Sequence, residues 1–546
     1  QSKTARFPPT TTKLHPAMNA MLRSSLLGLC VVAAAHAGRL DPHYSAAFGE
    51  EQASAIEGRI EGLEQALRPS FTSMPKNEFG KLGRSAVRYL LHRLFMQRGW
   101  SVRGLEPAGQ AWSLGSPLEV LGEQLPRQVQ ELFQERLHEH GFELHDVAAL
   151  AAAFQQLISS ENAERLQAAY QVYGLERGAE LDDESVGEVL DAYLMSYILS
   201  KNLSVLSVGE VYAHKLRLGR QYTNWPHAQE LMRETTERVV GSGRASFPAL
   251  QRVVEEVGEQ VGPLENEECR DRKRELMAVE REGSGRVRLA DFYRLNVHEG
   301  KWHFGESTGY LRQLGALDES QSDDLQVIIP NYVNSKSNCL DPSRYYSVCC
   351  LNECDELLSH VEQSLGSATS TPAEIAALVA ATPSSTVPGN RTLPATLMRR
   401  LNSIAQEHGG HVPLHGRLFA QWLHHAYPRE CPFPHISGTT SPQRVEEWAA
   451  GSGNSVVAAT DEMMAHIDAP EKVRSGDEED DGECAPWMHH EELLAPTWPP
   501  APEMGSKAEK DKNGMVVTWM GLSTIALPLA FASGAVRWPK TAEPVV

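Results

Sequence analysis

Oxygen-bearing residues recur through one short loop, residues 280–291, and could together bind a hard divalent cation. A glycine at position 285 supplies the sharp turn around which such ligands converge. Oxygen ligands at alternate positions around a glycine turn are typical of calcium sites in proteins. The sequence therefore predicts a candidate calcium site, whose ligands would be Glu280, Glu282, Ser284, Arg286 through its carbonyl, and Asp291.

This segment resembles the twelve-residue loop of the EF-hand superfamily, with Gly285 at position 6 and Val287 at position 8. The resemblance implies a helix before the loop, over 270–279, a second helix from Phe292, and β-bridges between paired loops. Three departures each weaken metal binding. Position 1 is Glu280 and not aspartate, position 9 is the cation Arg288, and position 12 is the short Asp291. Any calcium binding should therefore be weak, with a dissociation constant on the order of 10⁻⁴–10⁻³ M.

Three upstream segments are similar to the same loop but lack an acid at position 1. Their eighth positions are Leu144, Leu181 and Ala245. The spacing predicts that Leu144 pairs with Leu181 and that Ala245 pairs with Val287. These loops imply helix–loop–helix pairs that keep their packing but no longer bind a metal.

If the chain is secreted, it enters an oxidising compartment, where most of its cysteines would form disulfides. Cys350 and Cys354 have a C-x3-C spacing that also suits zinc, with a second ligand pair from His424, His425, Cys431 or His435. The connectivity is left open by the sequence. The disulfide candidates are Cys339, Cys349, Cys350, Cys354 and Cys431.

A second group of chemistry-bearing residues lies between 411 and 435. Imidazoles near a cysteine could form a metal site, an acid–base site or a pH-responsive interface, and Cys431 could act as a nucleophile. The structural alternative is a helix C-terminus and a proline-rich turn held by a disulfide. The histidines are His411, His415, His424, His425 and His435.

The two ends of the chain indicate the secretory pathway. Residues 18–37 have a charged start, an apolar run and a small-residue cleavage site, as in a signal peptide. An internal signal anchor is the alternative, and residues 1–17 are interpreted as non-native upstream sequence. Residues 515–536 carry no charge and predict one transmembrane helix, followed by a short tail at 537–546. Asn202 and Asn390 lie in glycosylation sequons.

Composition sets broader limits. The chain has 546 residues, a net charge of −20 and 41% hydrophobic residues. This length suits about three domains, and the apolar content is enough for real cores. The acidity argues against a nucleic-acid partner, since phosphate contacts need a basic face. HExxH, GxSxG and phosphate-loop motifs are absent where they would support catalysis.

The predicted fold is mainly α-helical: EF-hand-like helix–loop–helix pairs, a small disulfide-stabilised helical module, and one transmembrane helix. A strand is expected at 327–329, a partly disordered linker at 367–394, and helices at 394–408 and 416–427. The domains are an N-terminal helical region (38–127), an EF-hand-like domain (128–295), a Cys/His-containing module (321–470) and an acidic, proline-rich stalk (471–513).

Residues 328–354 and 411–434 also resemble parts of uncharacterised alveolate-type proteins, a resemblance that implies no function. The sequence favours a membrane-anchored structural or interaction protein in the lumen or outside the cell. It would bind a protein partner on a degenerate EF-hand scaffold. The alternatives are a low-affinity calcium-responsive membrane protein, or a metal- or thiol-dependent enzyme that uses the cluster at 411–435.

Overall fold

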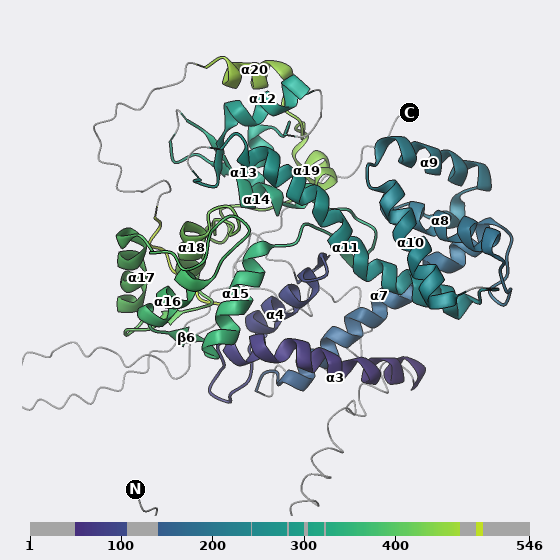
Figure 1. Cartoon of the computed structure of the whole chain (residues 1–546), viewed down its shortest axis with the longest axis horizontal. Coiled ribbons are helices and arrows are strands. Elements are labelled where there is room, and N and C mark those ends of the chain that lie inside the picture. The colour runs from purple at the N-terminus through teal and green to yellow at the C-terminus, as the bar shows by residue number, and fades with distance from the viewer. Residues whose placement is uncertain are drawn as a thin grey trace, which may run out of the picture. The chain divides into compact units, whose positions relative to one another are not determined.

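The computed structural model describes residues 50–105, 140–241, 243–280, 283–299, 304–321, 324–469 and 487–494. These residues are mainly helical with a few short strands, so the predicted fold class is confirmed at this level (Figure 1). None of the helices in these ranges is both long and apolar enough to cross a membrane. The predicted upstream sequence, signal peptide, membrane helix and tail (1–17, 18–37, 515–536 and 537–546) lie outside the described residues.

The N-terminal part is organised around two long helices, α7 (Leu144–Val172) and α11 (Phe247–Met277). Helix α3 (Glu50–Ser73) packs against α7, and α10 (Trp225–Val240) packs against α11. One hydrophobic core contains residues from Ile56 to Val261, together with Tyr346 and Val348, so it joins the predicted regions 38–127 and 128–295. The other elements here are α4 (Arg84–Met96), β1 (Trp100–Val102), α8 (Asp183–Leu199), the 3-10 helix η1 (Leu203–Val205) and α9 (Val208–Gln221).

The middle part has its own core, which begins within α11 at Cys269 and is rich in aromatic side chains such as Phe292 and Tyr332. Two helices near the C-terminal end of the module, α19 (Val445–Ser452) and α20 (Thr460–Ile467), also pack here. The other elements are β2 (Arg286–Arg288), α12 (Leu289–Glu299), α13 (Thr308–Leu314), β3 (Leu317–Asp318), β4 (Gln326–Ile328), α14 (Ile329–Val333) and the 3-10 helix η2 (Lys336–Asn338).

The C-terminal module encloses a third core around Trp422, which is fully buried and donates from Nε1 to the Leu397 carbonyl at 2.8 Å. Its first strand, β5, pairs with β1 and so joins the C-terminal module to the N-terminal part. The elements are β5 (Tyr346–Val348), α15 (Glu353–Leu365), β6 (Thr369–Ser370), α16 (Pro372–Ala381), α17 (Ala395–Glu407), β7 (Val412–Pro413) and α18 (Arg417–Ala426).

Loops pair through short antiparallel bridges, each of which precedes a helix. Leu82 bridges Phe142, Leu181 bridges Ala245, and β2 pairs with β4 so that Val287 faces Val327. In every case the helix begins two residues after the bridge, at residues 84, 144, 183, 247, 289 and 329. A bridge residue, a capping residue and a helix therefore recur as one local unit.

The predicted pairing of these loops is wrong. Leu181 pairs with Ala245, and Val287 pairs with Val327, whereas Leu144 is the first residue of α7. The physical reason is the length of the connecting helices. Helix α7 has 29 residues and α11 has 31, so each holds the loops at its two ends roughly 45 Å apart.

Six cysteines form three disulfides. Cys339–Cys349 closes a short turn with a Cα–Cα distance of 4.3 Å. Cys269–Cys350 fastens α11 to the segment after β5, and Cys354–Cys431 fastens α15 to the turn after α18. Every predicted disulfide candidate is paired, and Cys269 completes the set.

Two predicted segments differ from the structure. The linker expected at 367–394 contains α16, whose start is fixed by Pro372 in the first turn and by a capping box between Thr371 and Glu374. Within the expected stalk, residues 487–494 pack on the module. The Arg417 side chain donates to the carbonyls of Met488 and His490 at 2.7 and 2.6 Å, so this part is bound and not a free tether.

Candidate functional site

The loop predicted to bind calcium is docked against the turn that follows α18. The Glu280 side chain is buried, and its Oε1 accepts a hydrogen bond from Arg429 Nε at 2.6 Å. Gly285 has a φ of +71° and lies so close to that turn that a Cβ there would be 2.0 Å from the Pro428 carbonyl oxygen. Arg429 therefore supplies positive charge to the carboxylate that would occupy position 1 of a metal site.

The remaining predicted ligands have other neighbours. Arg286 donates from Nε to Asp318 at 2.8 Å, Ser284 Oγ accepts from the main-chain N–H of Arg286, and the Asp291 carboxylate pairs with Arg294. Glu282 lies outside the described residues. Burial alone would raise the pKa of Asp318, but the guanidinium of Arg286 holds it below its ordinary value. In the part of the chain that the structure describes, no group of three or more His, Cys, Asp or Glu side chains is arranged to hold a metal.

The five predicted histidines do not meet in one site. His411 is exposed, and His435 donates from Nε2 to the Gly315 carbonyl at 2.7 Å. His424 is fully buried between two partners: its Nδ1 is 2.7 Å from the Cys431 carbonyl, and its Nε2 is 3.2 Å from Arg286 Nη1. Burial, reinforced by Arg286, holds the pKa of His424 well below its ordinary value, so the ring is a neutral structural link. Cys431 is bonded to Cys354 and carries no free thiol.

The histidines of this region should make the fold sensitive to acid. Burial lowers the pKa of His425 to about 3, with Arg400 adding to the effect. The pKa of His425 is lower in the folded state than in the unfolded state. The contribution of its neutral ring to stability is therefore present above the unfolded pKa of about 6.5 and is lost as the pH falls. The free energy of unfolding of the wild type should fall between pH 7 and pH 5. In His425→Gln this fall is expected to be smaller by roughly 1–2 kcal/mol, measured by urea denaturation. An unchanged loss would contradict the burial of the ring, and the exposed His411→Gln is the control.

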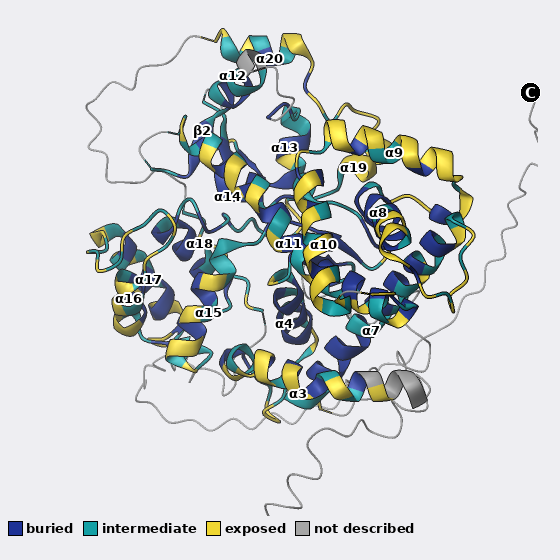
Figure 2. Cartoon of the chain, turned by 45° about the vertical axis from the view of Figure 1, so that its right-hand side comes forward, coloured by how far each residue is buried: buried dark blue, intermediate teal, exposed yellow. Residues whose placement is uncertain are grey.

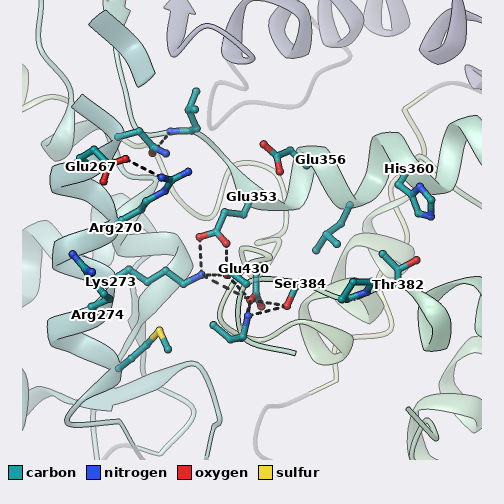
Figure 3. A pocket seen from close by; sticks show the side chains of 17 residues that line it. Glu267, Arg270, Lys273, Arg274, Glu353, Glu356, His360, Thr382, Ser384 and Glu430 are labelled. Carbon is teal, nitrogen blue, oxygen red and sulfur yellow. Dashed lines mark hydrogen bonds and ion pairs between the residues drawn. The ribbon is translucent and has the colours of Figure 1, made fainter. Parts of the chain in front are cut away.

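A polar cleft of about 740 Å³ opens between α11, α15 and the loop at 382–386 (Figure 3). In Figure 3 the Lys273 side chain reaches from α11 to the centre of the cleft, where Glu353 and Glu430 converge on it. Its Nζ lies 2.7 Å from Glu353 Oε1 and 3.9 Å from Glu430 Oε1. One buried ammonium group therefore faces two carboxylates.

Glu430 is the most constrained group in this cleft, with a side chain that is 1% exposed. Its Oε1 accepts from Ser384 Oγ at 2.8 Å and from the N–H and hydroxyl of Thr386 at 3.0 and 2.7 Å. Its Oε2 has no hydrogen-bond partner. The cleft thus combines a fixed carboxylate with the nearby cations Arg270, Lys273 and Arg274.

A second candidate surface is apolar and exposed. We call Val205, Val208, Tyr212 and Leu216 the α9 stripe, and these side chains are 75, 49, 62 and 47% exposed. They are four of the eight large apolar side chains exposed in the described ranges. Figure 2 shows α9 mostly in the colour of exposed residues. A neighbouring face of the helix buries Val211 and Leu218, so α9 is fixed in place while its stripe stays exposed.

Both predicted glycosylation sites are accessible. Asn202 and Asn390 are exposed, and Asn390 adopts a φ of +56°, which asparagine tolerates. Asn202 Oδ1 accepts from the Ser204 N–H at 3.0 Å to start η1, and this bond leaves the amide nitrogen for a glycan. Glycosylation at these positions stays a prediction.

No protein-family model, curated protein or solved structure matches this chain. Its chemistry is therefore argued from its own residues. Sequence reasoning missed the partners Arg429 and Lys273, which lie 149 and 80 residues from the acids that they contact. It also missed the α9 stripe, although Val208, Tyr212 and Leu216 recur at the four-residue spacing of a helix face.

Proposed function

We propose that this chain is a membrane-anchored interaction protein of the secretory pathway, built on helix–loop–helix pairs like those of EF-hand proteins, and that it binds a protein partner through the α9 stripe. The observation that carries the proposal is the exposure of four large apolar side chains, three along one face of α9 and the fourth, Val205, in η1 just before it. Contiguous exposed apolar patches on soluble surfaces are typical of interaction sites.

The bridged loops support the scaffold part of this proposal. Paired loops joined by an isolated bridge or by a short antiparallel ladder, each followed by a helix, are arranged as the EF-hand resemblance implies. Ion pairs take the place of a cation: Arg429 contacts Glu280, and Arg288 of β2 pairs at 2.9 Å with Asp324, which lies just before β4. Three disulfides suit an oxidising compartment.

The chemistry around the α9 stripe defines the partner. Arg217 and Arg220 are exposed on the same helix, and Lys201 is exposed just before it, although the chain as a whole has a net charge of −20. Positive charge beside an apolar stripe complements an apolar surface that is rimmed with carboxylates. We therefore expect a partner protein that presents an apolar helix face or groove with acidic edges.

A photo-crosslinker in the full-length protein tests this function. Placed at Val208 or at Leu216 in the cells that produce the protein, it is expected to capture the same partner from both positions. Tyr212→Glu should abolish both adducts, because it puts a charge at the centre of the stripe. Phe79→Glu, at a 53% exposed residue outside the stripe, is the matched control and should keep them. Adducts that survive Tyr212→Glu, or that contain lipid alone, would overturn the proposal.

The alternative function is low-affinity calcium binding by the 280–291 loop. The Glu280–Arg429 pair argues against it in the wild type and provides its test. Calcium up to millimolar concentration is expected to leave the melting temperature of the full chain unchanged, because the Glu280 carboxylate is already paired with Arg429. In Arg429→Ala the carboxylate loses its cation, and calcium is then expected to raise the melting temperature. Arg238→Ala, which removes an exposed pair with Glu256, is the control and should show no calcium effect. A calcium response in the wild type would contradict this expectation.

A further inference from the structure

Segment 487–494 contains no helix and lies against the C-terminal module at the start of α18. Its main chain bonds to the module: Leu493 forms a single antiparallel bridge with Gly416. Two main-chain hydrogen bonds of 3.0 Å flank this bridge and join the segment to residues 415 and 417. Main-chain bonding of this kind to a short peptide is one general mode of linear-motif recognition.

Two adjacent carboxylates of the segment are held by donors of the module. Glu491 is 15% exposed, and its Oε1 accepts from the Leu418 N–H in the first turn of α18 at 3.1 Å. Its Oε2 lies 3.2 Å from His408 Nε2. Glu492 accepts from the N–H and the hydroxyl of Ser437 at 3.2 and 2.9 Å. The N–H groups at a helix N-terminus favour a carboxylate, so the module reads this pair of acids directly.

A buried arginine of the module holds the main chain of the same segment. Arg417 is 5% exposed, and its guanidinium donates to the carbonyls of Met488 and His490 at 2.7 and 2.6 Å. The same group donates to Gln421 and to the Pro434 carbonyl within the module. A buried donor that loses its acceptor is costly, so this guanidinium needs peptide carbonyls at the place where the segment lies.

Gly416 and Trp487 fix how closely the segment fits the module. Gly416 has a φ of −112°, which any residue adopts, but an added Cβ would lie 3.1 Å from both carboxylate oxygens of Glu491. The absence of a side chain at this position therefore leaves room for the carboxylate. At the other end of the segment, the Trp487 ring lies 5.8 Å from the His425 ring and 4.9 Å from the Arg400 guanidinium.

We infer that the surface formed by residues 408, 415–418 and 437 is a peptide-recognition site for a linear motif with two adjacent glutamates followed by leucine, and that segment 487–494 is the copy of this motif that the chain itself supplies. The same motif on a partner protein would meet the same donors. Because the chain's own segment is tethered, its effective concentration is high, and a partner has to displace it. The site is separate from the α9 stripe, so either proposal can fail alone.

A labelled synthetic peptide of residues 487–494 tests the inference on the full-length protein. In the variant with Glu491→Gln and Glu492→Gln, the chain's own segment loses both carboxylates. The peptide is expected to bind this variant more tightly than the wild type by roughly tenfold or more, measured by fluorescence anisotropy, because the wild-type segment competes.

Matched peptides and one further variant make the test specific. Changing both glutamates of the peptide to glutamine should weaken binding roughly tenfold. A peptide with His489→Ala, at an exposed position, is the control and should keep its affinity. Adding Gly416→Ala to the double variant should also weaken binding, since the new Cβ crowds the glutamate without straining the backbone.

Failure of the peptide to bind the folded double variant, or equal binding of its glutamine form, would overturn the inference. A second experiment leaves every residue of the site unchanged, and it applies if the double variant does not fold. Sites for a specific protease are inserted within 471–486 and within 495–513, so that the segment can be cut free. The freed segment is expected to dissociate on dilution and to be replaced by the labelled peptide. A segment that neither dissociates nor exchanges would be a permanent part of the fold, which would also overturn the inference.

Discussion

Glu362→Ala is expected to destabilise the protein by about 3–5 kcal/mol, the largest effect of any single side chain considered, because it removes the closest carboxylate from the buried cation Arg93 and leaves only Asp355, at 3.9 Å. The Glu362 side chain is 0% exposed and that of Arg93 is 4% exposed, and the two form an ion pair. Glu362 also accepts from Ser70 Oγ at 3.0 Å and from His415. Chemical denaturation of purified protein measures the loss.

Two comparisons make this prediction specific. Glu230→Ala removes an acid that is 52% exposed and pairs with Arg233 on the surface, and it should cost less than about 1 kcal/mol. Replacing both buried partners, as Arg93→Met with Glu362→Leu, should cost less than Glu362→Ala, since the buried guanidinium is removed together with its carboxylate. A loss in Glu362→Ala no larger than in Glu230→Ala would contradict the burial of the pair.

Gly285→Ala is expected to cost about 3 kcal/mol and to release the 283–288 loop from the turn after α18. Two penalties add. A φ of +71° is unfavourable for alanine, and the new Cβ would lie 2.0 Å from the Pro428 carbonyl oxygen. Hydrogen exchange should show faster exchange of the amides in β2, together with the lower stability.

Gly283→Ala is a matched control in the same loop. Its φ is +74°, but the nearest atom to an added Cβ would be Arg429 Nη2, at 3.6 Å. It therefore carries the backbone penalty without the collision, and it should cost about 1–2 kcal/mol. Equal losses for the two glycines would show that the docking of the loop on Pro428 contributes nothing.

Some of the fold follows from local sequence. The strand expected at 327–329 is β4, and the helices expected at 394–408 and 416–427 are α17 and α18. Helix periodicity, caps and β-branched runs act over a few residues, so they can be recognised without knowing the rest of the chain. The helix missed at 372–381 had such a signal in Thr371-Pro372 and Glu374, but the alanine- and serine-rich composition around it favoured a linker.

Tertiary structure alone decided which loops, cysteines and charged side chains of this chain contact one another. The sequence marked Leu181, Ala245 and Val287 as bridge residues, yet which loops meet depends on the span of α7 and α11. The cysteines were candidates without a connectivity until α11 and α15 fixed their neighbours. Arg429 reaches Glu280 from 149 residues away, a contact that no local pattern encodes. The local sequence thus determined the secondary-structure elements and the reactive side chains. Long-range packing determined which charges and which loops face one another.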